Sequence, residues 1–136
     1  MKIPEKIRKI MEQKRTIGFA TCSKDNIPNC VPMLQYWWLG DQLVVGDLFM
    51  KATSRNVKET GLVSFCVWDD MGESYKFIGK AKYETSGAAY EFANSILHKT
   101  KPDKNFKGVV VIDIIEIYEA ARNASAGNLL FSAEKE

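Results

Sequence analysis

The segment Ser74–Glu84 alternates between two kinds of side chain, and this pattern limits the possible folds more than any other in the chain. One side of the segment consists of Tyr75, Phe77, Gly79, Ala81 and Tyr83. The other side consists of Lys76, Lys80, Lys82 and Glu84, with Ile78 among them. Because successive side chains of a strand point to opposite faces, the alternation predicts a β-strand with one buried face. Gly79, a glycine inside such a strand, is a candidate for a bend or bulge.

Five further segments have the length and composition of β-strands, and turn-forming residues separate them. They are Ile17–Cys22, Asn29–Leu39, Gln42–Asp47, Leu62–Trp68 and Val109–Tyr118. The last of these is apolar on both faces for most of its length, so we expect both faces to be covered.

Three segments show the apolar spacing of helices. The first opens the chain and carries on one face Ile3, Ile7, Ile10 and Met11. The second is Lys51–Thr60, which Gly61 closes. In the third, Ser86 is the expected N-cap of a helix whose apolar positions are Ala88, Phe92 and Ile96. Six strands with helices at the crossovers predict a mainly β fold, a β-barrel with flanking helices, because closure removes the exposed edges of a sheet.

The composition fits one globular domain that spans residues 1–136. The chain is 46% hydrophobic and 26% charged, which is ordinary for a folded domain of this size. The charged N-terminus lacks the apolar middle of a signal peptide, and no apolar run is long enough to cross a bilayer, so we expect a cytoplasmic protein without a membrane partner. A net charge of +2 gives no independent support to a nucleic-acid partner.

Metal and nucleophile chemistry has little support in the sequence. The three cysteines Cys22, Cys30 and Cys66 form no C-x-x-C pair and have no histidine nearby, so we expect reduced thiols and no zinc site. The single histidine, His98, ends a predicted helix and is expected at the surface. The acidic cluster fits the tip of a hairpin and consists of Asp69, Asp70 and Glu73.

The segment Val45–Asn56 runs from the end of a strand into the start of a helix. Such a start offers unpaired backbone N–H groups to an anion such as phosphate. Thr53 and Ser54 add hydroxyl groups, and Lys51 and Arg55 add positive charge. Two interpretations stay open: an anion site, or an ordinary capped helix with solvated cations, which is the more common arrangement.

The aromatic strand is the second candidate site. Trp37 and Trp38 are consecutive, so they face opposite sides of the strand and cannot share one core. One of them is therefore expected to face a ligand, a partner or a second subunit, unless one packs in the barrel and the other in a dimer interface. Pro32 breaks the hydrogen-bond ladder and leaves backbone groups available to a flat heterocycle.

The order of several short motifs resembles the FMN-binding split-barrel family related to pyridoxamine 5′-phosphate oxidase, especially its short single-domain members. These motifs lie at Gly18–Thr21, Pro28–Pro32, Gly46–Asn56, Ile78–Ala81, Thr85–Gly87 and Val109–Ile117. The resemblance implies a six-stranded antiparallel split barrel that forms a homodimer, with FMN in a groove at the dimer interface.

The resemblance also implies which residues contact FMN. The strand around Pro32 would line the flavin ring, and the segment Gly46–Asn56 would hold the phosphate. The predicted contacts are Val31, Pro32, Met33, Leu34, Gln35, Gly46, Asp47, Met50, Lys51, Thr53, Ser54 and Asn56.

The chain departs from the family pattern at two places. Members of the family often have a lysine directly before the threonine of the phosphate motif, where this chain has Ala52, so Lys51 and Arg55 are the cations left to compensate. The tail Arg122–Glu136 has no histidine, so vitamin B6 oxidation is not expected.

The function predicted from the sequence is an FMN-binding oxidoreductase or electron-transfer protein. No residue stands out as a general acid or base, so electron transfer without a dedicated substrate is as compatible with the sequence as catalysis. The first alternative is a non-enzymatic split barrel that binds haem, a deazaflavin or a nucleotide. The second is a binder of single-stranded nucleic acid, which exposed aromatics beside basic residues would suit.

Overall fold

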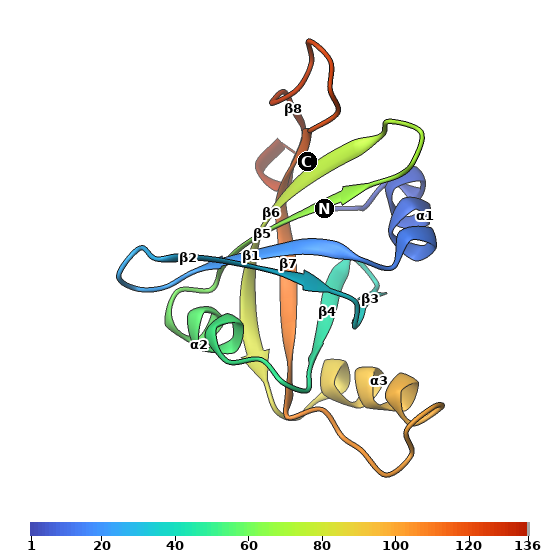
Figure 1. Cartoon of the computed structure of the whole chain (residues 1–136), viewed down its shortest axis with the longest axis vertical. Helices are drawn as coiled ribbons and strands as arrows, with labels where there is room; N and C mark the ends of the chain where they lie inside the picture. The colour runs from blue at the N-terminus through green and yellow to red at the C-terminus, as the bar shows by residue number, and fades with distance from the viewer. Residues whose placement is uncertain (136) are drawn as a thin grey trace.

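The computed structural model describes residues 1–135, and one antiparallel sheet forms its framework (Figure 1). Along the sheet the strands follow the order β2-β1-β5-β6-β7-β4-β3, and β8 pairs with β7. The described strands are β1 Ile17–Cys22, β2 Pro28–Met33, β3 Tyr36–Leu39, β4 Gln42–Asp47, β5 Leu62–Trp68, β6 Ser74–Glu84, β7 Gly108–Glu119 and β8 Leu129–Ser132. The sheet curls around a core of apolar side chains, so the chain is a mainly β split barrel, as the sequence predicted. The predicted number of six strands was wrong: the described residues form eight, because the predicted strand Asn29–Leu39 is two strands and β8 follows β7.

A short link joins β2 to β3. These two strands are the opposite ends of the strand order, yet only Leu34 and Gln35 separate them in the chain. The Gly46 N–H donates a hydrogen bond of 2.9 Å to the Gln35 carbonyl, which ties this link to β4. The prediction of one long strand Asn29–Leu39 was therefore wrong, because the chain must turn at this link to pair first with β1 and then with β4.

Three helices and one 3-10 turn cover parts of the sheet. They are α1 Glu5–Lys14, α2 Ala52–Glu59, α3 Ala88–Leu97 and η1 Ala133–Lys135. The apolar face of α1 (Ile7, Ile10 and Met11) packs into the barrel core, as its spacing predicted. None of the helices in this part of the chain is both long enough and apolar enough to span a membrane.

The strand β7 is buried on both faces, as its composition predicted. Val110 and Ile112 face the barrel core. Val109 and Val111 belong to a second cluster, which α3 completes from the other side with Ala89, Ala93 and Leu97. This double burial explains why β7 has no polar alternation over its first half.

The helix α3 starts one residue later than predicted. Its N-cap is Gly87, with φ 97°, and not Ser86. Glycine suits this position because side chains rarely adopt positive φ. The fully buried apolar positions are Ala89, Ala93 and Leu97 instead of the predicted Ala88, Phe92 and Ile96, although Phe92 is partly buried against the same cluster.

The strand β6 has the predicted two faces and the predicted irregularity. Tyr75, Phe77 and Ala81 are buried. The pairing with β7 shifts register between Ile78 and Gly79. A Cβ atom at Gly79 would lie 2.6 Å from Cγ2 of Ile112, so no larger residue fits there without movement.

The two consecutive tryptophans lie on opposite faces of β3, as expected. Trp38 packs on the main core, with the Arg8 guanidinium 5.0 Å from its ring centre. Trp37 packs against Phe106 in the second cluster, with ring centres 6.1 Å apart. The expectation that one of them needs a ligand or a second subunit was wrong, because α3 and its following loop supply a second apolar cluster.

Candidate functional site

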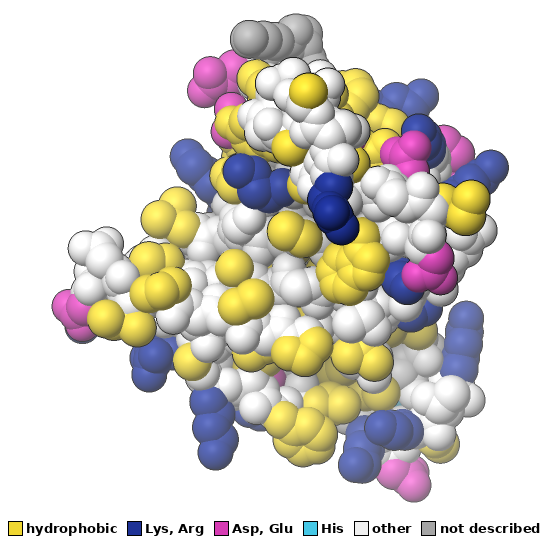
Figure 2. Space-filling model, turned by 45° about the horizontal axis from the view of Figure 1, so that its top comes forward, with side chains coloured by type: hydrophobic (Ala, Val, Ile, Leu, Met, Phe, Trp, Pro, Cys, Tyr) yellow, Lys and Arg dark blue, Asp and Glu magenta, His cyan; other side chains and the backbone are white. Residues whose placement is uncertain are grey.

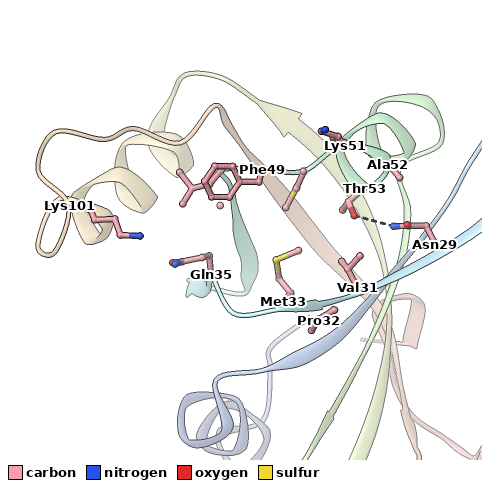
Figure 3. Close-up of a pocket in the computed structure, with 13 residues that line it drawn as sticks. Asn29, Val31, Pro32, Met33, Gln35, Phe49, Lys51, Ala52, Thr53 and Lys101 are labelled. Atoms are coloured by element: carbon pink, nitrogen blue, oxygen red, sulfur yellow. Dashed lines mark hydrogen bonds between the residues drawn. The ribbon is translucent and has the colours of Figure 1, made fainter.

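An open groove of about 600 Å³ lies between β2, the start of α2 and the loop after α3 (Figure 3). Small-molecule sites commonly have volumes of about 300–1,000 Å³. The groove is lined by Asn29, Val31, Pro32, Met33, Gln35, Gly46, Leu48, Phe49, Met50, Lys51, Ala52, Thr53 and Lys101. These residues come from three separate segments of the chain, 29–35, 46–53 and Lys101, so only the fold brings them together.

The middle of the groove is apolar. Val31, Pro32 and Met33 come from β2, and Leu48, Phe49 and Met50 come from the segment that follows β4. Phe49 is 82% exposed, so a large ring stands at the mouth of the groove in contact with solvent. An exposed aromatic side chain above an apolar wall is suited to a flat ligand.

The two ends of the groove are cationic. Lys51 immediately precedes α2 at one end, and Lys101 lies at the other end, where Figure 3 shows its ammonium group directed toward the groove. Both side chains are exposed. An anionic group therefore meets positive charge at either end.

The start of α2 adds backbone donors to the Lys51 end. The first helical hydrogen bond runs from the Arg55 N–H to the Lys51 carbonyl at 3.1 Å. The N–H groups of Ala52, Thr53 and Ser54 precede this bond and are not used by the helix. No side chain caps this helix start, so these groups can bind an anion.

The buried carboxylate of Asp47 holds the segment that carries Phe49 and Met50. Asp47 is 1% exposed and does not line the groove. It accepts hydrogen bonds from the Met50 N–H at 2.8 Å and from the Tyr83 hydroxyl at 2.6 Å. Lys107 Nζ lies 3.8 Å from the same carboxylate. Burial, together with the hydrogen bond to Asp47 and its negative charge, raises the pKa of Tyr83 well above its usual value.

A network of polar side chains lies beneath the start of α2. The Asn29 amide nitrogen is 3.2 Å from Thr21 Oγ1 and 3.1 Å from Thr53 Oγ1. The Asn56 amide nitrogen donates to the same Thr21 oxygen at 3.0 Å. Asn56 is 1% exposed, and its amide oxygen has no partner among the described residues.

Eight of the twelve predicted FMN contacts line the groove; they are Val31, Pro32, Met33, Gln35, Gly46, Met50, Lys51 and Thr53. The other four lie outside the lining. Leu34 is 57% exposed and does not line the groove. Asp47 and Asn56 are buried and do not line it either. The Ser54 hydroxyl donates to the Lys51 carbonyl at 3.2 Å.

Sequence reasoning missed part of the lining. Asn29 falls within a motif that the sequence analysis quoted, but it was not taken as a site residue. Lys101 lies in the lysine-rich segment Lys99–Lys107, where no sequence signal separates a groove residue from ordinary surface charge. Phe49 and Leu48 lie in the predicted phosphate segment, and no local signal separates their apolar contact from the phosphate contacts.

The other groups that the sequence analysis considered are a metal cluster, His98 and the acidic hairpin tip. No group of three or more His, Cys, Asp or Glu side chains is placed to hold a metal ion in residues 1–134. His98 is exposed and contacts Asn105 at 2.8 Å. The Asp69 carboxylate accepts from the Met71 and Glu73 N–H groups, as expected at the tip of the β5–β6 hairpin.

The curled sheet, with its β2–β3 link at Leu34–Gln35 and a groove beside it, defines a split-barrel protein. A family model described as pyridoxamine 5′-phosphate oxidase matches residues 3–121. The chain belongs to this family.

Relatives and solved structures agree with this assignment. An uncharacterized protein of Methanocaldococcus jannaschii is 31% identical, over 98% of this chain and 91% of its own length. The crystal structure of HupZ from Group A Streptococcus has a TM-score of 0.79 at 22% identity, over 92% of this chain and 99% of that one. An FMN-binding protein from Syntrophomonas wolfei has a TM-score of 0.72 at 18% identity, over 88% and 86% of the two chains.

The same fold is used by proteins with other ligands in their names. An F420 reductase has a TM-score of 0.65 at 20% identity, over 85% of this chain and 98% of that one. HutZ, the heme storage protein from Vibrio cholerae, has a TM-score of 0.68 at 12% identity, over 88% and 95%. At these identities the likeness concerns the fold alone.

Proposed function

We propose that this chain is a flavoprotein that binds FMN in the groove between β2 and α2. The observation that carries the proposal is the joining of an apolar wall to an anion site in one cavity. The wall formed by Val31 and Met33 suits the flavin ring. Lys51, Thr53 and the unused N–H groups at the start of α2 suit the phosphate.

The groove residues fit FMN in chemistry as well as in volume. FMN has one dianionic end and one flat aromatic end, and the groove offers donors at one end and apolar contact in its middle. When bound, FMN would supply the redox chemistry by accepting and releasing electrons. The role left to this chain is to bind the flavin, to orient it and to shield it from water. Electron transfer and hydride transfer are both consistent with this role.

A homodimer is the second part of the proposal. The side chains that face outward from β1, β2 and β5 carry no charge; they are Gly18, Ala20, Cys22, Pro28, Cys30, Pro32, Leu62, Ser64, Cys66 and Trp68. Figure 2 shows that hydrophobic side chains are spread over the centre of one face, with most charged side chains toward its edges. Uncharged exposed sheet faces are typical of interfaces. Pro32 belongs both to this face and to the groove lining, so a second copy on this face would adjoin the flavin.

The absorption spectrum tests the cofactor directly. Purified untagged protein is expected to show flavin absorption that survives desalting, or to acquire it after incubation with FMN. Lys51→Gln is expected to weaken FMN binding by about tenfold or more, because a hydrogen bond to a charged group contributes about 1.5–3 kcal/mol. Lys99→Gln, at an exposed lysine outside the groove, is the matched control. A colourless protein that does not quench FMN fluorescence would refute the proposal.

The departure at Ala52 gives an independent test. Ala52→Lys restores the lysine that family members often carry before the threonine, and it is expected to tighten FMN binding by about tenfold through a charge-assisted contact. Titration of FMN fluorescence measures the change. An unchanged affinity would show that the phosphate does not lie at the start of α2.

The dimer is tested by gel filtration with light scattering. The wild-type chain is expected to elute as a dimer at micromolar concentration. Leu62→Arg places a charge in the uncharged face and is expected to give monomers, whereas Ile27→Arg is the matched control at the tip of the β1–β2 hairpin. A wild-type monomer under these conditions would count against a flavin site at an interface.

A deazaflavin or haem is the second candidate ligand, because an F420 reductase and a heme storage protein share the fold. For haem the donor set is poor. The described groove lining includes no His, Cys or Tyr, and its sulfur atoms belong to Met33 and Met50. A Soret absorption band in place of the flavin absorption bands would favour haem over FMN.

A further inference from the structure

Asn29 joins β1, β2 and α2 through its amide group. It lies directly opposite Thr21 in the pairing of β1 with β2. Its amide nitrogen donates to Thr21 Oγ1 at 3.2 Å and to Thr53 Oγ1 at 3.1 Å (Figure 3 shows the second bond). Both hydrogens of the amide are therefore engaged, each by a threonine from a different element.

The Thr21 oxygen holds this arrangement in place. Thr21 is 3% exposed, and its hydroxyl also accepts from the Asn56 amide nitrogen at 3.0 Å. A hydroxyl oxygen has two lone pairs, so two amide donors saturate it. Asn56, 1% exposed on α2, thereby fixes Thr21, and Thr21 fixes Asn29.

The direction of these bonds determines what Thr53 can offer to a ligand. A threonine hydroxyl has one proton to donate. Because Thr53 Oγ1 accepts from Asn29, its proton is not used in that bond. Among the described residues, Thr53 Oγ1 donates no hydrogen bond, and Thr53 lines the groove beside Lys51.

We propose that Asn29 is a positioning residue that holds the Thr53 hydroxyl as a proton donor toward an anionic group of the groove ligand. The inference rests on the proposed function, in which that group is the phosphate of FMN. Its consequence is selectivity: the network stabilises bound FMN and contributes little to bound riboflavin, which has the same ring but no phosphate.

Asn29→Asp reverses the network without a large change of shape. A carboxylate only accepts hydrogen bonds, so Thr53 must turn its proton toward residue 29 and present lone pairs to the phosphate. The variant is expected to bind FMN about tenfold or more weakly, because a charge-assisted hydrogen bond is lost. Its affinity for riboflavin is expected to change by less than twofold. Asn26→Asp is the matched control, since it adds the same charge at the tip of the same hairpin.

A double-mutant cycle tests whether Asn29 acts through Thr53 without introducing the negative charge of Asn29→Asp. Asn29→Ala and Thr53→Val are each expected to lower FMN affinity, and the combined variant is expected to be no weaker than Thr53→Val alone, because Asn29 acts through Thr53. Thr53→Ser keeps the hydroxyl and is expected to restore most of the affinity. Circular dichroism and thermal unfolding establish whether each variant is folded. If Asn29→Asp does not fold, the double-mutant cycle alone tests the inference.

The outcomes distinguish the inference from the proposed function. If wild-type protein binds FMN but Asn29→Asp and Asn29→Ala change FMN and riboflavin affinity in equal proportion, the inference is overturned and the flavin proposal stands. Additive effects of Asn29→Ala and Thr53→Val also overturn it. If wild-type protein binds neither flavin, the proposed function fails and the inference fails with it.

Discussion

Removing the Tyr83 hydroxyl tests the role of the buried Asp47 carboxylate. In Tyr83→Phe, the Asp47 oxygen that accepts from Tyr83 at 2.6 Å loses its partner, while the Met50 N–H at 2.8 Å and the Lys107 ammonium at 3.8 Å remain. The ring keeps its contact with Lys58, whose ammonium lies 4.3 Å from the ring centre. The change therefore isolates one hydrogen bond to a buried charge.

The expected loss of stability follows from that bond. A hydrogen bond to a charged group contributes about 1.5–3 kcal/mol, and a neutral one about 1 kcal/mol. Tyr90→Phe is the matched control, because the Tyr90 hydroxyl donates to a neutral group, the Phe106 carbonyl, at 2.8 Å. Urea unfolding measures both free energies of unfolding. A Tyr83→Phe variant that loses no more stability than Tyr90→Phe would refute the argument that Asp47 is held as a partnered charge.

The stability difference between wild type and Tyr83→Phe is also expected to depend on pH. The pKa of Tyr83 is raised above its ordinary value of 10.0, by burial first and then by the hydrogen bond to Asp47 and its charge. Above pH 10 the unfolded state therefore loses this proton while the folded state keeps it. The contribution of Tyr83 to the free energy of unfolding is therefore complete below pH 10 and falls as the pH rises further. The stability difference between wild type and Tyr83→Phe is expected to shrink above pH 10 and to be constant between pH 7 and 9. A difference that grows at alkaline pH would contradict this sign.

Two further substitutions test the packing around the groove. Gly46→Ala places a Cβ atom 2.4 Å from the Phe106 ring and is expected to cost about 1–3 kcal/mol in urea unfolding. An unchanged free energy of unfolding would show that the Phe106 ring is not tightly packed against Gly46. Arg8→Ala removes a hydrogen bond of 2.9 Å to the Gly40 carbonyl and the stacking on Trp38, and it is expected to lower the melting temperature by several degrees. An unchanged melting temperature would show that these Arg8 contacts do not stabilise the packing of α1.

Local patterns in the sequence determined most of the elements. The alternation in β6, the two apolar faces of β7 and the amphipathic spacing of α1 each follow from burial of one or both faces, and all three were predicted correctly. The break between β2 and β3 was not predictable from the residues around Leu34, because it depends on β2 pairing with β1 and β3 pairing with β4. The break follows from pairing with two different strands, and Leu34–Gln35 contains no turn-forming residue that would predict it.

The tertiary structure, and no single sequence motif, determines which residues line the groove. From local signals alone, the segment around Lys51 and Thr53 was either an anion site or an ordinary capped helix, and only the family resemblance favoured the anion site. Asn29 reaches the cavity from β2, Phe49 from the segment after β4, and Lys101 from the loop after α3. Their positions in the sequence do not indicate that they lie close together. Folding of the barrel brings these segments together, so which donors face the ligand was decided only when the sheet curled and α2 packed against β1.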